Sequence, residues 1–90
     1  MARVRATVRG RVQGVSYRWS TVDEASDRGL VGWVKNQRDG SVLLEAQGPP
    51  GELEGLLAWC RRGPAGAHVT AVEVEWLAER PGEERFEIRH

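Results

Sequence analysis

The sequence has few of the residues from which covalent and metal-based sites are built. Cys60 is the only cysteine among 90 residues, so neither an intrachain disulfide nor a cysteine-based metal site can form. The two histidines, His68 and His90, lie far apart and belong to no serine or cysteine motif, which argues against a nucleophilic triad. The scattered glutamates show no metal-ligand spacing. We therefore expect no metal site.

Long apolar runs and an excess of one charge are also missing. No run is long enough to span a membrane and the N-terminus shows no signal-peptide pattern, so a cytoplasmic protein without a membrane partner is expected. The 13 basic and 13 acidic residues give a formal net charge of zero, whereas a general nucleic-acid binder usually carries a positive excess. The length indicates one domain, residues 1–90, and the lack of a large exposed apolar stripe favours a monomer.

Asparagine and lysine are nearly absent as well. Asn36 is the only asparagine and Lys35 the only lysine, against 12 arginines. Few amides and many charges are typical of heat-adapted proteins. Five arginines crowd the first eighteen positions and predict a local positive field that suits a small anion: Arg3, Arg5, Arg9, Arg11 and Arg18.

What is present is a clear succession of strand and helix patterns. Apolar alternation predicts strands around residues 4–8, 31–37, 42–46, 72–76 and 86–88, with a hairpin turn at 38–41. One helix is expected from about Trp19, with an apolar stripe through Val22 and Ala25 and a left-handed Gly29 at its end. A second helix carries Leu53, Leu56, Leu57 and Cys60 on one stripe and stops at Gly63 and Pro64. The four tryptophans, at positions 19, 33, 59 and 76, are interpreted as structural.

This order, β-α-β-β-α-β with a short fifth C-terminal strand, predicts an α+β, ferredoxin-like sandwich. In that arrangement two helices cover one face of an antiparallel sheet. The first two strands run parallel with the third between them, so both end at the same edge of the sheet, roughly 10 Å apart. The loop from Gly10 to Tyr17 follows the first of these ends, and Asn36 lies at the second.

The loop itself has the composition of an anion site. Gly10 and Gly14 allow backbone angles that can aim successive N–H groups inward, and the following helix adds positive charge at its start. Arg18 falls at that start, where its guanidinium can hold two phosphate oxygens. Arg11 comes too early in the loop to join them, and we expect it to face solvent.

From the residues alone, plainer interpretations stay open. The glycines can be turn formers, Arg18 a solvated helix residue and Asn36 a turn residue. Ser16 is better explained as a helix N-cap than as a nucleophile, because nothing supplies it with a base. Tyr17 is expected to pack rather than to react.

Two longer segments carry a specific resemblance. "GRVQGVSYR" and "GWVKNQRDGSVLLEAQG" are similar to the two signature segments of the acylphosphatase family, with further matches in "WCRRGPAGAHV" and "FEI". The resemblance covers essentially the whole chain. It implies a ferredoxin-like fold, no cofactor, and an acyl phosphate as the small-molecule substrate, hydrolysed to a carboxylate and inorganic phosphate.

The resemblance also implies roles for individual residues. Arg18 corresponds to the family's phosphate-binding arginine and Asn36 to the asparagine that holds the attacking water. The backbone amides of six residues correspond to the phosphate cradle: Gln13, Gly14, Val15, Ser16, Tyr17 and Arg18. Tyr17 departs from the family, which commonly has phenylalanine there, and this leaves the fine geometry of the loop open.

Binding modules on the same scaffold are the competing interpretation. An RNA-recognition domain needs exposed aromatics on its central strands, where this chain has "VRATV" and "VLLEA". A metal carrier needs paired cysteines. A catalytically silent module that binds phosphate or carbamoyl phosphate remains open, and phosphate binding without turnover would identify it.

Overall fold

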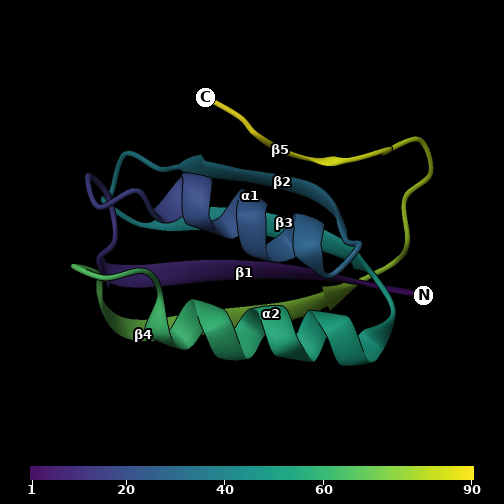
Figure 1. The fold of residues 1–90 in the computed structure, drawn as a ribbon, viewed down its shortest axis with the longest axis horizontal. Helices are drawn as coiled ribbons and strands as arrows, with labels where there is room; N and C mark the ends of the chain where they lie inside the picture. The colour runs from purple at the N-terminus through teal and green to yellow at the C-terminus, as the bar shows by residue number, and fades with distance from the viewer.

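The computed structural model describes all residues from Met1 to His90 and contains the seven elements that the sequence predicts. Figure 1 shows their arrangement around one sheet. The chain order is β1 (Ala2–Arg11), α1 (Tyr17–Asp27), β2 (Val31–Asn36), β3 (Val42–Gly48), α2 (Pro50–Arg62), β4 (His68–Leu77) and β5 (Phe86–Ile88).

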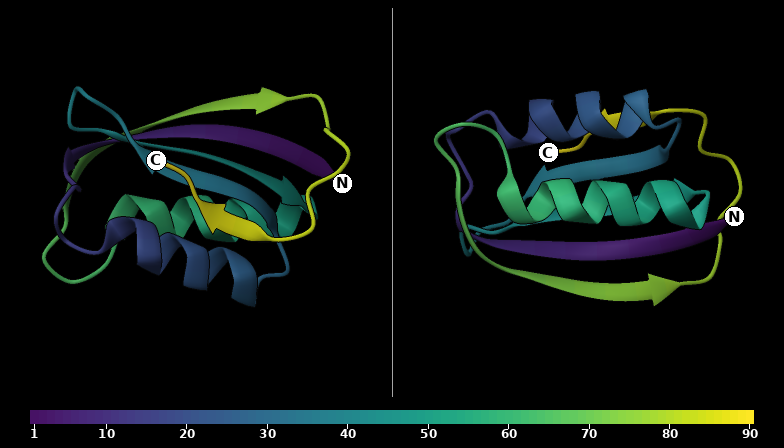
Figure 2. Two further views of the ribbon diagram at one scale, coloured as in Figure 1. Left: turned by 90° about the horizontal axis from the view of Figure 1, so that it is seen from above. Right: turned by 60° about the horizontal axis from the view of Figure 1, so that its bottom comes forward.

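The sheet has the strand order β4-β1-β3-β2-β5. β3 pairs antiparallel with both β1 and β2, so β1 and β2 are parallel with β3 between them, as predicted. β5 adds to the outer side of β2 in the parallel direction. Both helices lie on the same face of the sheet (Figure 2). The ferredoxin-like α+β fold is therefore confirmed.

The core lies between the helices and this face of the sheet. Val4, Ala6 and Val8 alternate along β1 and are fully buried, because every second side chain of a strand points to the same face. The predicted stripe of α2, from Leu53 to Cys60, is buried against them. Gly29 has a φ of 70° just after α1, as a left-handed helix end requires.

The buried side of α1 agrees with the prediction in part. Ala25 is fully buried and Val22 packs partly buried against the core, as predicted. Tyr17 and Thr21 are buried as well, whereas Trp19 is exposed. Thr21 can be buried because its hydroxyl donates a hydrogen bond of 2.8 Å to the carbonyl of Tyr17, one turn earlier. Hydropathy alone therefore missed the polar part of the buried side.

The tryptophans divide into two groups. Trp33 is buried and Trp59 packs against the core, in agreement with a structural role. Trp19 and Trp76 are 69% and 51% exposed, so the structural interpretation is wrong for these two. Trp76 lies on β4, at the edge of the sheet, and Trp19 lies in the first turn of α1.

Three arginines of β1, Arg3, Arg5 and Arg9, form ion pairs on the sheet face opposite the helices. Arg3 and Arg5 donate to the buried carboxylate of Glu45 at 2.8 and 2.7 Å, and Arg3 also pairs with Glu83 at 2.7 Å. Arg9 pairs with Asp39 and Glu73 at 3.2 and 3.1 Å. The expected positive field is therefore wrong for β1, because carboxylates distant in the sequence neutralise it.

One end of the molecule collects the parts that the sequence singles out. In Figure 1 the end of β1, the start of α1 and the β2–β3 turn meet on the left-hand side. Gly10 allows β1 to approach β4 closely there: it has a φ of 121°, and a Cβ atom would meet the carbonyl oxygen of His68 on β4. The strand register shifts between Arg9 and Gly10, so a bulge bends the last residues of β1, which stay paired with β4, just before the loop.

Candidate active site

A small hollow lies at this end, between the loop after β1, the first turn of α1 and the end of β2. Its volume is about 90 Å³, and seven residues line it: Val12, Gly14, Ser16, Tyr17, Arg18, Trp19 and Asn36. A hollow needs roughly 10–15 Å³ of such space for one water molecule, so this one has room for a tetrahedral oxyanion together with water. Arg18 and Asn36, from different elements, thus share one hollow, as the sheet topology predicts.

The loop wall of the hollow is made of backbone. Gly14 and Ser16 both have left-handed φ angles, 77° and 62°, on either side of Val15. Alternation of this kind turns successive N–H groups toward one point, the arrangement called an anion nest. None of the backbone N–H groups from Gln13 to Trp19 donates a hydrogen bond within the chain. These amides are therefore free to bind an anion.

The start of α1 adds unbalanced positive charge. Its first turn contains no acidic residue, whereas the first turn of α2 contains Glu52. A helix start carries about half a positive charge, which a nearby carboxylate would offset. In α2 the side chain of Glu52 supplies that carboxylate. In α1 no side chain supplies one, so a bound anion could take its place.

Arg18 is the charged side chain of the hollow. It makes no ion pair and no hydrogen bond within the chain, and it is half-buried. The other arginines without ion pairs are exposed to solvent: Arg11, Arg38, Arg61, Arg62 and Arg80. Among them Arg11 faces solvent as predicted. Arg18 is thus the one arginine without an ion pair that is not exposed.

Asn36 forms the opposite wall. It is the last residue of β2 and pairs with Val42, and like Val34 two residues before it, its side chain lies on the helix side of the sheet. Its carboxamide makes no hydrogen bond within the chain, yet it is not cut off from water, since Trp33 Nε1 is the only buried side-chain polar atom without a partner. The amide is available to a ligand or a water in the hollow.

Gln13 has a role that the sequence did not reveal. Its side-chain Nε2 donates to the carbonyl oxygens of Gln37 and Ser41, at 2.7 and 2.9 Å. These carbonyls frame the turn between β2 and β3, which is closed by the bond from Gln37 N to Ser41 O at 2.9 Å. One amide group therefore fixes the loop to the strand end that carries Asn36. In the sequence, only the scarcity of amide side chains singled out Gln13.

Tyr17 connects the start of α1 to the last turn of α2. Its hydroxyl donates a 2.7 Å hydrogen bond to the carbonyl of Cys60, in the last turn of α2. Burial, with a contribution from Cys60, raises the pKa of Tyr17 far above its usual value, so the phenol stays neutral. The ring passes close to Gly63, where a Cβ atom would lie 2.8 Å from it. Tyr17 therefore packs, as predicted, and links the two helices.

Ser16 occupies the N-cap position of α1, but its hydroxyl makes no capping bond. The prediction of its place is thus confirmed and that of its capping role is wrong. A left-handed residue does not have the extended backbone from which an N-cap side chain reaches the N–H groups of the first turn. Instead the hydroxyl of Ser16 borders the hollow.

No acid–base group borders the hollow. The lining contains neither a carboxylate nor a histidine nor a cysteine. His68 is exposed at the start of β4, and the thiol of Cys60 is buried, which raises its pKa to about 12. No three His, Cys, Asp or Glu residues are grouped closely enough to hold a metal ion. Neither helix has the length and hydropathy to cross a bilayer.

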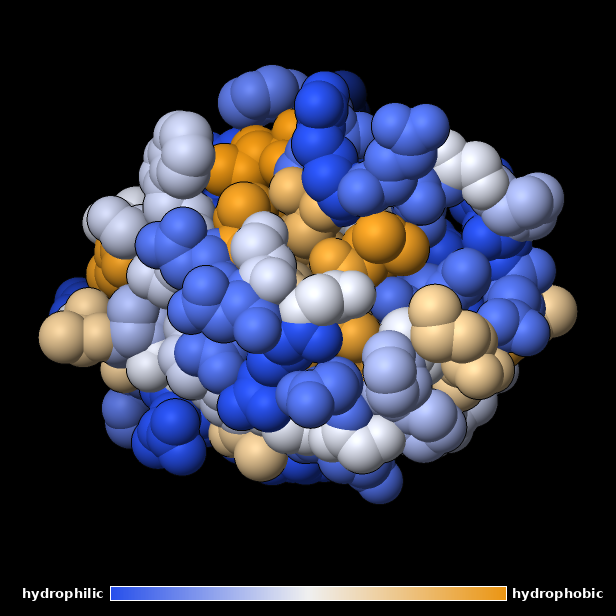
Figure 3. All heavy atoms as spheres, turned by 45° about the vertical axis from the view of Figure 1, so that its right-hand side comes forward, coloured by the Kyte–Doolittle hydropathy of each residue, from blue (hydrophilic) through white to orange (hydrophobic).

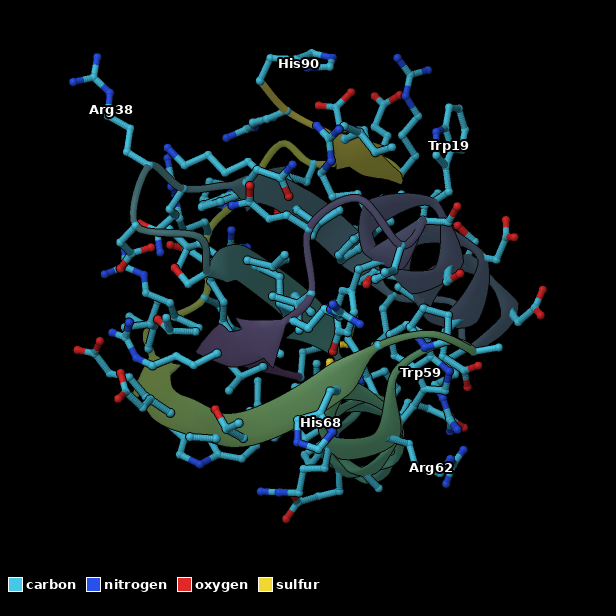
Figure 4. All side chains as sticks on the ribbon, turned by 90° about the vertical axis from the view of Figure 1, so that its left-hand side faces the viewer. Trp19, Arg38, Trp59, Arg62, His68 and His90 are labelled. Carbon is cyan, nitrogen blue, oxygen red and sulfur yellow. The ribbon has the colours of Figure 1, made fainter.

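Figure 4 shows this end of the molecule, with Trp19 projecting outward from the start of α1. Trp59, Arg62 and His68 lie around the neighbouring junction between α2 and β4. The hollow therefore lies at the end of the sheet, and the groups that it offers to a ligand are backbone amides, one guanidinium and one carboxamide.

Comparisons with known proteins agree with this fold. The family model for acylphosphatase matches residues 4–88. An acylphosphatase from Anaeromyxobacter is 46% identical over all of this chain and 97% of its own length, and one from Methylococcus capsulatus is 53% identical over 87% and 85% of the two chains. The crystal structure of acylphosphatase from Bacillus subtilis superposes with a TM-score of 0.96 at 38% identity, covering both chains completely. The chain belongs to the acylphosphatase family, and it is a hydrolase.

Proposed function

We propose that the chain hydrolyses the carboxyl–phosphate bond of acyl phosphates in the hollow between the loop of residues 12–16, the start of α1 and the end of β2. The observation that carries this assignment is Arg18. Its guanidinium is half-buried and forms no ion pair. It lies next to free backbone amides and to a helix start whose positive charge no side chain offsets. An anion would bind to all three. A phosphoryl group supplies the charge and the oxygens that all three can bind.

Binding places the phosphoryl group against the loop. The amides from Gln13 to Arg18 donate to its oxygens, and the planar guanidinium of Arg18 takes two of them. Phosphoryl transfer depends mainly on positioning and on stabilising the charge that spreads over the equatorial oxygens. Donors held rigidly by the fold perform this task without reorganisation.

The attacking water is held by the carboxamide of Asn36, on the opposite wall. Fixing that water in line with the bond to the leaving group removes much of the entropic cost of the reaction. The leaving group is a carboxylate whose acid has a pKa of about 4, so it departs without a proton at neutral pH. This agrees with a lining that offers no general acid. The bound phosphate itself takes the proton of the water.

The test is hydrolysis of benzoyl phosphate by the purified protein with excess chelator. Arg18→Ala is compared with Arg11→Ala, which removes an exposed arginine at the end of β1, seven positions earlier in the chain. We expect turnover to fall at least ~100-fold in Arg18→Ala, as for the loss of a single oxyanion donor, and to stay near normal in Arg11→Ala. A folded Arg18→Ala protein with normal turnover would contradict the site.

A silent phosphate-binding module is the alternative with the same loop. It would bind inorganic phosphate through Arg18 but hydrolyse neither benzoyl phosphate nor acetyl phosphate. Phosphate binding measured by calorimetry on the wild-type protein and on Arg18→Ala, beside the turnover assay, separates the two functions.

The remaining assignments concern the state of the protein. A single domain is supported by one core cluster of 16 buried residues, to which strands and helices from the whole chain contribute. A cytoplasmic monomer is supported by the single cysteine, which is free and buried, and by the face in Figure 3, where hydrophilic residues surround one central group of hydrophobic ones. Light scattering across a range of concentrations tests the monomer.

A further inference from the structure

Trp19 is the one part of the hollow that the phosphate chemistry does not use. Its side chain is 69% exposed although it is among the largest apolar groups of the chain. Single exposed apolar residues are common and need no explanation by themselves. What distinguishes Trp19 from the other exposed large residues, Met1, Val74 and Trp76, is that it borders the hollow next to Arg18.

The geometry of the reaction gives this position a meaning. The attacking and leaving oxygens lie roughly in line through phosphorus, so a water held at Asn36 sends the acyl group away from β2. The lining on that side consists of the loop and the first turn of α1. Val12 and Tyr17 are buried, Gly14 has no side chain, and Ser16 is polar. Trp19 is therefore the only exposed apolar surface that the acyl group can meet.

We infer that the indole of Trp19 is the platform for the acyl group and makes this chain select acyl phosphates with an aromatic or bulky apolar acyl part. The inference rests on the proposed function, because it assigns the second half of the same substrate. An aromatic acyl group stacks on the indole and removes apolar surface of both from water. Acetyl phosphate has a single methyl group and gains little from the same surface.

The test compares kcat/KM for benzoyl phosphate and acetyl phosphate in the wild-type protein, Trp19→Ala, Trp19→Phe and Trp76→Ala. Trp76→Ala is the matched control, since it removes a tryptophan that is 51% exposed at the far edge of the sheet. We expect the preference for benzoyl over acetyl phosphate to fall about tenfold in Trp19→Ala, mainly through KM, to be largely restored by Trp19→Phe, and to stay constant in Trp76→Ala.

Competitive inhibition tests the same contact with Trp19 without turnover. Phenylphosphonate and methylphosphonate are compared as competitive inhibitors, because they share the phosphoryl oxygens and differ only in the organic part. Trp19→Ala is expected to weaken the aromatic inhibitor about tenfold more than the methyl one.

The outcomes separate the two proposals. Equal losses for both substrates and both inhibitors in Trp19→Ala would overturn the inference, since Trp19 would then support the loop rather than the acyl group. A wild-type protein that hydrolyses both substrates, with a preference that Trp19→Ala leaves intact, overturns the inference alone. A folded wild-type protein that hydrolyses neither substrate overturns the proposed function and the inference together.

Discussion

Arg3 and Arg5 of β1 differ from Arg18 of α1 in what compensates the charge of the guanidinium. Arg3 is completely buried and Arg5 about half-exposed, and both share the carboxylate of Glu45, which is 2% exposed. Arg18 has no carboxylate at all. Charges taken from water need compensation, and on β1 the compensation is built into the chain. At Arg18 the chain supplies none, which leaves the guanidinium available to a ligand.

The role of each arginine in an arginine-rich segment therefore depends on its partner and not on the segment itself. The five arginines of the first eighteen residues are alike in sequence, yet three stabilise the sheet, one faces solvent and one borders the hollow. Partners decide the role, and the partners of the strand arginines lie 30 to 80 residues further along the chain. Substitutions of the paired and the unpaired residues therefore test whether they serve stability or ligand binding.

The largest effect is expected at the paired side. Glu45→Ala leaves Arg3 buried with Glu83 as its only carboxylate, and loss of one partner of a buried pair typically costs about 3 kcal/mol or more. We expect the free energy of unfolding to drop by about this amount in urea titrations. Glu73→Ala, which breaks an exposed pair with Arg9, is the control and should change it by less than about 1 kcal/mol. Equal effects in both variants would contradict the importance of burial.

The same pair makes stability depend on acid. Burial raises the pKa of Glu45, but the hydrogen bonds from Arg5 and Arg3 outweigh it and hold the pKa below the ordinary 4.5. A lowered pKa in the folded state stabilises the fold above about pH 4.5, and this contribution is lost as the pH falls further. Stability measured from pH 6 down to 3 should therefore decline less steeply in Glu45→Ala than in the wild-type protein.

The next effect is expected at the unpaired side. Asn36→Ala removes the carboxamide that we propose to hold the water, and turnover of benzoyl phosphate should fall at least ~100-fold with little change in stability. Lys35→Ala is the control, because Lys35 is the neighbour on the opposite face of β2. A rate within a few-fold of wild type in a folded Asn36→Ala protein would remove Asn36 from the mechanism.

A smaller effect is expected where the two helices meet. Tyr17→Phe removes the hydroxyl that binds the carbonyl of Cys60 and leaves that buried carbonyl unpaired. Such a loss costs about 1–2 kcal/mol, which thermal unfolding detects as a lower Tm. An unchanged Tm would mean that water or another group replaces the bond.

The smallest effects are expected at Ser16. Because its hydroxyl caps nothing, Ser16→Ala should cost under about 0.5 kcal/mol instead of the ~1 kcal/mol of a true N-cap. Ser16→Gly should stabilise the protein by about 0.5–1 kcal/mol, because glycine adopts the left-handed φ of 62° without steric strain. Loss of more than 1 kcal/mol in Ser16→Ala would restore the capping interpretation.

Local patterns predicted much of the fold and less of the site. Alternation along Val4, Ala6 and Val8 and the stripe from Leu53 to Cys60 identify their elements because burial imposes the period. The order of elements then places the end of β1 beside the end of β2. The buried face of α1 could be predicted only in part, since the bond from Thr21 to its own helix hides a polar group that hydropathy places outside.

In the site, Arg18 and Asn36 were found through resemblance, and topology explains why they meet. The contacts that position them were not visible in the sequence. The side chain of Gln13 reaches two carbonyls 24 and 28 residues away. Ser16 adopts a left-handed backbone although it is not a glycine, so its sequence does not indicate that conformation. Such features depend on three-dimensional distance rather than on local pattern, and so they need a structure.

The bonds of Gln13 also set a rule for how this chain can vary. Its single amide group reaches Gln37 O and Ser41 O at once, and the three residues between them, Arg38, Asp39 and Gly40, are exposed. An insertion or deletion would pull one of the two carbonyls out of reach. Two of the three residues are also constrained, because the carboxylate of Asp39 accepts hydrogen bonds from Ser41 and Gly40 has a left-handed φ of 93°. Natural or engineered diversity at this turn therefore has to respect its length as well as these two residues.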